Sequence, residues 1–175
     1  MLMALAPLVS GCGLLGGGLS GTRLSSPASL TVTSPVFASD VPLPTVYTCH
    51  GEGFSPPLQW SGATTQTAKS FAIVVDDSQA PITPYVYWIV FDVSPTTVAI
   101  GQNLLPTGAR IAMNSAGKAS YDPPCPVGAW HQYRFTVYAL NSVIRLQNGV
   151  PLRAAWSAIA SHVMASGRLT ARAYP

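Results

Sequence analysis

The alternation of apolar and polar positions along the chain predicts a series of β-strands. Residues Leu30–Ser34 alternate apolar and hydroxyl side chains, a pattern typical of a half-buried strand. Residues Ser70–Val75 form a continuous apolar run that ends at an acidic pair, which predicts a central, buried strand. The aromatic and β-branched run Tyr85–Val93 is expected to pair with it, and Tyr133–Leu140 predicts a third long strand.

One helix is predicted near the C-terminus, over Leu152–Ser166, because apolar side chains recur there at intervals of three and four. Its apolar face consists of Leu152, Ala155, Trp156, Ile159 and Val163. Pro151 and Gly167 stand where a helix typically begins and ends. A last short strand is expected at Arg168–Tyr174, so the pattern predicts a β-sandwich-like domain with one helix packed on it.

Composition supports a mainly β fold. The chain has 175 residues, which fits one domain, and 48% of them are hydrophobic, enough for a core. Only 9% are charged, whereas 16 prolines and 15 glycines predict many turns.

Residues Val98–Tyr121 have little periodicity and predict a long irregular loop of the kind that often borders a site. The net charge of +3 is scattered without a basic stripe, which argues against nucleic acid as a partner.

The N-terminal segment resembles a bacterial lipoprotein signal. Leu8-Val9-Ser10-Gly11-Cys12 is similar to a lipobox, whose cysteine carries the lipid and becomes the mature N-terminus. We therefore expect residues 1–12 to be a signal segment, 13–29 a flexible tether rich in Gly and Ser, and 30–175 the folded domain. This predicts an exported protein, lipid-anchored on the outer face of a bacterial cell membrane.

A cytosolic alternative stays open at this stage, with Cys12 a bystander in an apolar N-terminus. Only about ten residues precede the lipobox, and none of them is Lys or Arg, whereas a signal peptide has a basic first region. A start codon placed too late would explain both features. No later stretch reaches the ~18 apolar residues of a membrane-spanning helix, so we expect any attachment to come from this end.

Three separated segments carry a family resemblance. They are YTCHGEGFSPPLQW at 47–60, FAIVVDDSQAP at 71–81 and DPPCPVGAWHQYRFTVYAL at 122–140. In order and spacing the chain resembles the phosphatidylethanolamine-binding protein (PEBP) family, in its bacterial Raf-kinase-inhibitor-like branch. The resemblance implies a PEBP-like β-sandwich whose small anion-binding pocket is bordered by a long irregular loop.

The resemblance also implies which residues line that pocket. Asp77 matches the first aspartate of a DPDxP loop that ends at Ala80-Pro81, and His131 and Tyr133 match a GxHRY segment. An imidazole and a phenol can donate hydrogen bonds to phosphate-like oxygens, and a carboxylate can orient the histidine.

Several positions depart from the family pattern. Gln79 stands where the family has its second aspartate, Tyr87 where an HW dipeptide has histidine, and Gln132 where arginine follows the histidine. His50 replaces an aspartate of the bacterial consensus. Because an acid and a histidine are missing, we expect an anion site that is weaker or adapted to another polar ligand, with Asp77, Gln79, Tyr87, His131 and Tyr133 as ligand-binding residues.

Each of these residues also has a purely structural interpretation. The acidic pair that closes Ser70–Val75 could be a solvated turn, and His131 and Tyr133 could be half-buried strand residues. The tryptophans are expected to pack in the core or pocket wall, namely Trp60, Trp88 and Trp130. His162 is expected to pack within the helix.

Cysteine usage depends on the compartment. Cys49 and Cys125 lie beside proline-rich segments that the family brings near its pocket, so export would allow a disulfide, whereas in the cytosol both would remain thiols.

No pair of residues has metal-ligand spacing, and we expect no metal, cofactor or catalytic residue. The predicted function is therefore a non-enzymatic, membrane-tethered protein that binds a small anionic or polar headgroup. The alternative is a protein-interaction module, for example a kinase or protease inhibitor.

Overall fold

In a computed structural model of the protein, residues 29–79 and 84–175 are described, and they form two packed β-sheets with one α-helix. The large sheet has the order β2 (Val41–Pro42), β9 (Val163–Ala173), β8 (His131–Leu140), β4 (Ser70–Asp77), β5 (Tyr85–Val93) and β7 (Arg110–Ile111). The small sheet has the order β1 (Thr31–Thr33), β3 (Leu58–Ser61) and β6 (Ala99–Ile100). Short 3₁₀ turns occupy Thr45–Tyr47 and Ala63–Gln66.

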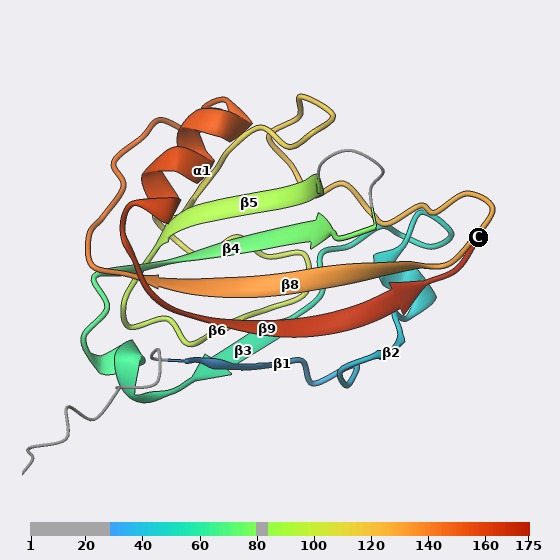
Figure 1. The fold of residues 1–175 in the computed structure, drawn as a ribbon, viewed down its shortest axis with the longest axis horizontal. Helices are drawn as coiled ribbons and strands as arrows, with labels where there is room; N and C mark the ends of the chain where they lie inside the picture. Colours follow the sequence, from blue (N-terminus) through green and yellow to red (C-terminus); the bar gives the residue numbers. More distant parts are fainter. Residues whose placement is uncertain (1–28, 80–83) are drawn as a thin grey trace, which may run out of the picture.

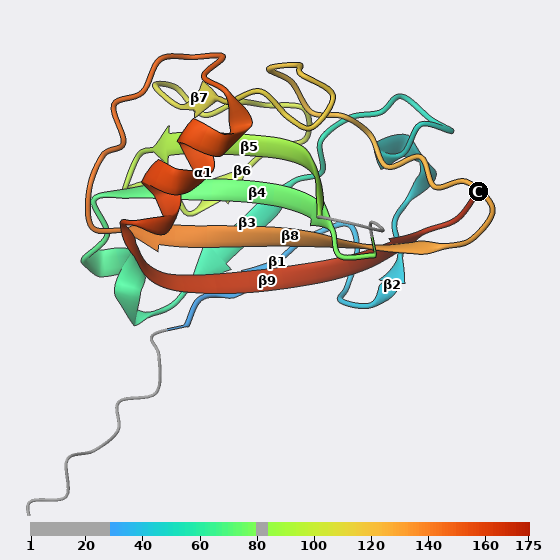
Figure 2. The same cartoon turned by 45° about the horizontal axis from the view of Figure 1, so that its top comes forward.

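The large sheet is covered on both faces, which explains the continuous apolar run in β4. Phe71 and Ile73 point into the core between the two sheets, together with Trp60 of β3. Val74 points to the opposite face and packs in a second cluster with Ile159 of α1 (Leu152–Ala160). Figures 1 and 2 show the small sheet behind the large one and α1 over its other face. The predicted mainly β sandwich is thus confirmed.

The strand predictions for the centre of the sheet are also confirmed. Strand β4 lies between β5 and β8 and pairs antiparallel with both. Residues Val98–Tyr121 are irregular as expected, apart from the two-residue strands β6 and β7. No helix among the described residues is long and apolar enough to cross a membrane.

The predicted helix was too long. Helix α1 ends at Ala160, and the chain reverses at Ser161 and His162 before β9 begins at Val163. Ala155 and Ile159 form the buried face as predicted, whereas Trp156 is 42% exposed and Val163 lies in the strand. The predicted short final strand is therefore the second half of an eleven-residue strand.

Gly167 does not end the helix but lies inside β9, opposite Val137 of β8. A Cβ at this position would lie 2.1 Å from the carbonyl oxygen of Leu30. Only glycine therefore lets the start of the domain pass this close to β9, where Leu30 N donates a hydrogen bond to Ser166 O.

Candidate functional site

A buried carboxylate and a partly exposed imidazole lie where β4 ends and β8 begins. The side chain of Asp77 is only 3% exposed, that of His131 is 29% exposed, and Oδ2 of Asp77 lies 2.6 Å from Nδ1 of His131. A carboxylate can only accept a hydrogen bond, so Nδ1–H donates and the ring orientation is fixed. This leaves Nε2 of His131 as the nitrogen that can meet a ligand.

The position of this pair follows from strand register. Asp77 pairs with Tyr133 in β8 and with Tyr85 in β5, so the three strand ends meet at one edge (Figure 1). Side chains alternate between the faces of a strand, so His131 and Tyr133, two residues apart, share the face of Asp77. Both residues lie on one strand as expected, but only His131 is half-buried, whereas Tyr133 is fully buried.

The acidic pair is not a solvated turn, because both carboxylates have partners within the sheet. Asp76 faces the helix side and accepts two hydrogen bonds from Arg134, at 2.7 Å from Nε and 2.5 Å from the terminal nitrogen. Asp77 also accepts a hydrogen bond from the backbone N–H of Gln79 at 2.8 Å. No feature of the sequence indicates Arg134 as the partner of Asp76.

Gln79 belongs to a polar chain that runs outward from the pair. Its Oε1 accepts a hydrogen bond from the backbone N–H of Gln132 at 2.6 Å, and Nε2 of Gln132 donates to Oδ1 of Asp40 at 2.9 Å. Thr170 donates a further bond to the same oxygen at 2.6 Å and is the main cause of the lowered pKa of Asp40. The side chain of Gln79 thus holds the start of β8 to the end of β4, and the side chain of Gln132 holds it to Asp40, just before β2.

Tyr87 is the extra residue of a β-bulge. Val75 pairs with Trp88, whereas Asp76 pairs with Val86, so Tyr87 has no direct partner in β4. A bulge redirects a side chain out of strict alternation, and the Tyr87 ring packs edge-on against Tyr133 at 5.2 Å between centroids. Tyr87 therefore reaches the core side of the sheet near Asp77. Burial raises its pKa to about 12.

The hydroxyl of Tyr133 is buried without a hydrogen-bond partner among the described residues. The residue is 0% exposed, and this burial raises its pKa well above the ordinary tyrosine value. The Tyr87 hydroxyl is near enough to affect that pKa, yet the two groups do not meet hydrogen-bond geometry. An unpaired buried hydroxyl costs about 1–3 kcal/mol, so this group is available to a ligand or water that reaches it.

An aromatic wall extends the site along β5. The Tyr85 ring packs at a tilt against the Tyr87 ring, with 4.6 Å between centroids. Its hydroxyl donates a hydrogen bond to Oδ2 of Asp122 at 3.1 Å. Tyr121 donates to the carbonyl oxygen of Tyr47 at 3.2 Å, and burial raises its pKa. Tyr85 and Asp122 were not predicted as site residues, although Asp122 opens one of the segments that carry the family resemblance.

A disulfide joins two loops beside the site. Cys49 and Cys125 are bonded, with 5.3 Å between their Cα atoms, and the backbone N–H of Cys49 donates to the carbonyl oxygen of Pro124. The bridge ties the segment before β8, a strand that begins at His131, to the loop that follows the 3₁₀ turn at Thr45–Tyr47.

The remaining predictions, for the tryptophans and the other histidines, are only partly correct. Trp60 and Trp88 are buried as expected, but Trp130 is 43% exposed and lies 5.1 Å below the guanidinium of Arg172, so its predicted packing in the core or pocket wall is wrong. His162 lies just beyond the helix rather than within it, and its Nδ1 is 2.8 Å from Oδ1 of Asn141. His50 is exposed in the loop that carries Cys49.

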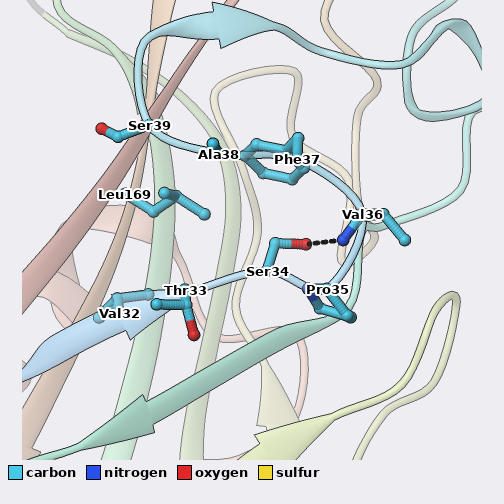
Figure 3. Close-up of a pocket in the computed structure, with 9 residues that line it drawn as sticks. All are labelled: Val32, Thr33, Ser34, Pro35, Val36, Phe37, Ala38, Ser39 and Leu169. Atoms are coloured by element: carbon cyan, nitrogen blue, oxygen red, sulfur yellow. Dashed lines mark hydrogen bonds between the residues drawn. The ribbon is translucent and has the colours of Figure 1, made fainter.

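Two cavities lie away from the Asp77–His131 pair. The first, of about 540 Å³, is formed by residues 32–39 between β1 and β2 with Leu169 (Figure 3). Its lining is apolar apart from hydroxyl groups and holds no charged side chain, so it offers little to an anion. The second, of about 570 Å³, lies between α1 and the large sheet.

The chemistry available at the candidate site is hydrogen bonding rather than metal ligation. Among residues 29–79 and 84–175, no three His, Cys, Asp or Glu side chains are grouped so that they could hold a metal ion. The site combines an oriented imidazole, phenolic hydroxyls and amide groups, which suit a small oxyanion or polar headgroup. Ala80 and Pro81, the predicted end of the loop, and Cys12 lie outside the described residues.

The fold and site define a β-sandwich protein with a small polar site at one end of its large sheet. The chain belongs to the phosphatidylethanolamine-binding protein family, whose model matches residues 33–174.

Its relatives span two domains of life. The chain is 35% identical over 132 residues to a UPF0098 protein of Methanothermobacter thermautotrophicus, covering 73% of this chain and 87% of that protein. It is 41% identical over 116 residues to a UPF0098 protein of Mycobacterium bovis, covering 65% of this chain but only 55% of the relative. It is also 37% identical over 142 residues to a Mycobacterium tuberculosis protein, LppC, whose name marks it as a candidate lipoprotein, covering 80% of this chain and 70% of the relative.

A solved structure shares the fold. The crystal structure of a PEBP homologue from Chlamydia trachomatis superposes with a TM-score of 0.75 at 32% identity, covering 83% of this chain and 97% of that chain. The predicted family is therefore confirmed by sequence and by fold.

Proposed function

We propose that the protein is a non-enzymatic binding protein whose site at the ends of β4 and β8 accepts a small oxyanion or polar headgroup. The observation that carries the proposal is the hydrogen bond between the buried carboxylate of Asp77 and the partly exposed imidazole of His131. Because Nδ1 of His131 is hydrogen-bonded to Asp77, Nε2 is the ring nitrogen left to face a ligand, and a protonated ring can donate from Nε2 to an anion.

Two further features support this proposal. The hydroxyl of Tyr133 on the same strand face supplies a donor that has no partner within residues 29–79 and 84–175. Tyr87, whose ring packs against Tyr133, brings a second phenolic hydroxyl to the same side of the sheet. Because Gln79, Tyr87 and Gln132 replace charged or imidazole groups of the family pattern, we expect millimolar rather than tight binding of phosphate.

A binding role fits the surroundings of His131 better than catalysis does. Nucleophilic catalysis needs a hydroxyl or thiol within hydrogen-bond reach of the base. Among the described residues, the only side chain hydrogen-bonded to His131 is Asp77. The cysteines nearest to it in the sequence are those of the disulfide, which are not nucleophilic thiols.

We further propose that Cys12 is lipidated and that the tether 13–29 holds the domain at a membrane. The LVSGC segment and the lipoprotein name of the LppC relative support this. Mass spectrometry of the mature protein would detect a diacylglyceryl mass on Cys12. An unmodified chain that begins at Met1 would contradict the anchoring, without affecting the proposed binding site.

The binding proposal is tested by titrating phosphate or phosphoethanolamine while observing histidine ring signals by NMR. The three histidines provide internal controls, because His162 and His50 lie outside the site. We expect the His131 signals to shift in a saturable manner and those of His162 to stay in place. If His131 does not respond at millimolar ligand, the proposed site does not bind these anions.

A further inference from the structure

The second cavity lies on the opposite face of the large sheet from the Asp77–His131 pair. It has a volume of about 570 Å³ and is bounded by β4, β5, β8, β9 and the first turns of α1. Figures 1 and 2 show α1 lying over the end of the sheet where β4 begins. The volume is within the range of sites that hold small organic ligands.

Part of this cavity is apolar. Val74, Val86 and Ile89 form its floor on the sheet, and Leu152 and Trp156 form the wall on α1. Trp156 packs edge-on against Tyr138 at 5.6 Å, yet it remains 42% exposed. A large aromatic side chain half open to water beside an apolar floor favours a hydrocarbon or ring as occupant.

The other part of the cavity is positively charged. Arg134 is neutralised by its paired hydrogen bonds with Asp76. Arg168 and Arg153 also line the cavity, and neither forms a salt bridge with a carboxylate within the described parts of the chain. The cavity thus carries three guanidinium groups against one carboxylate.

A hydrogen bond to the neighbouring strand fixes the position of Arg168. It stands opposite Thr136 in the β8–β9 ladder, and its Nε donates to the buried Oγ1 of Thr136 at 3.0 Å. This bond uses Nε of the guanidinium; the rest of the group lies near the Tyr138 hydroxyl, and no carboxylate of the described residues is paired with it. A planar guanidinium can donate two parallel hydrogen bonds to one oxyanion.

We propose that this cavity binds an amphiphile with an anionic headgroup and a medium-length apolar body. The headgroup meets Arg168 and Arg153, and the apolar body lies between Trp156 and the floor of the sheet. The site is separate from the oxyanion site at His131, because the two open on opposite faces of β4. Carboxylate and phosphate headgroups share this chemistry, and the experiment distinguishes them.

The test is isothermal titration of the full chain with decanoate and with decyl phosphate, followed in parallel by Trp156 indole signals. Acetate tests the need for the apolar body, and decyltrimethylammonium tests the sign of the charge. We expect both decyl anions to bind and to shift Trp156, with the tighter one identifying the headgroup. Acetate, which lacks the apolar body, and the cation, which cannot accept a hydrogen bond, should each bind at least about tenfold more weakly.

Matched variants separate the cavity from general charge effects. Arg168→Gln should weaken decyl anion binding about tenfold or more, while Arg145→Gln, the same change on an exposed arginine outside the cavity, should leave it unchanged. Trp156→Ala should also weaken it, and near-UV circular dichroism verifies that each variant is folded. Equal binding of the decyl cation, or unchanged affinity in both Arg168→Gln and Trp156→Ala, would overturn the proposal.

Discussion

Asp76 and Asp77 are neighbours in β4, yet their carboxylates lie on opposite faces of the sheet and pair with different side chains. Asp76 accepts two hydrogen bonds from Arg134 on the helix side, and Asp77 is hydrogen-bonded to His131 on the core side. The alternation of a strand therefore makes one acidic dipeptide serve two separate polar sites. This arrangement allows each site to be altered while the other stays intact.

Replacing Asp77 by Asn should damage the His131 site selectively. Asp77 accepts two hydrogen bonds, from Gln79 and His131, and an amide has one oxygen acceptor. We expect the free energy of unfolding to fall by about 1–3 kcal/mol and phosphate binding to weaken. Asp76→Asn is the matched control, which should lower stability without changing phosphate affinity. Urea denaturation and phosphate titration of both variants would reveal whether the two effects separate.

Replacing Tyr133 by Phe should leave stability unchanged or raise it. The hydroxyl is buried without a partner, so its removal relieves a desolvation cost of about 1–3 kcal/mol and leaves the ring packing intact. Phosphate affinity should fall, because a donor is lost. A variant that is less stable and binds phosphate as well as the parent would indicate a structural role for this hydroxyl instead.

Removing the disulfide should lower stability and loosen the site. The bridge spans 76 residues in sequence, and a cross-link of this length stabilises a fold by about 2–5 kcal/mol in the chain-entropy model. We expect the Cys49→Ser, Cys125→Ser double variant to unfold at lower urea concentration and to bind phosphate more weakly. Reduction of the parent protein is the control and should reproduce both effects. Equal unfolding midpoints for the oxidised and reduced protein would refute the prediction.

Stability should decline at alkaline pH. Burial raises the pKa of Tyr87 from 10.0 to about 12. Between these values the unfolded chain loses the proton while the folded protein keeps it, so the free energy of unfolding falls as pH rises. Denaturation at a series of pH values from about 9 to 12 would measure the slope. The slope should be smaller in Tyr87→Phe, and an identical slope in this variant would count against the assignment.

The long strands and the candidate site residues could be predicted because their signals are local. Val74 and Val75 belong to a run buried on both faces, and His131 and Tyr133 stand two apart on one strand. The family resemblance placed Asp77 and His131 in one pocket, whereas nothing indicated Arg134 as the partner of Asp76, because it is more than fifty residues away in sequence. Such pairings follow from strand register, which the sequence alone does not specify.

The errors near the C-terminus have a physical cause. Four of the five core-facing positions of β9 are small, namely Ala165, Gly167, Ala171 and Ala173, and only Leu169 is large. Alanine favours helices and gives little hydrophobic contrast, so the strand alternation was hidden and the helical period was extended across it. The bulge at Tyr87 was equally hidden, since a register shift leaves no mark in the sequence of one strand.

The central claim is that the end of β4 and β8 forms an oxyanion site, and a crystal of the protein soaked in phosphate tests it most directly. The account predicts difference density for the anion within hydrogen-bond distance of Nε2 of His131, with the Asp77 contact to Nδ1 retained. It also predicts that the density disappears in Asp77→Asn crystals under the same conditions. A site at His131 that stays empty at saturating phosphate, while the ion binds elsewhere, would contradict the account.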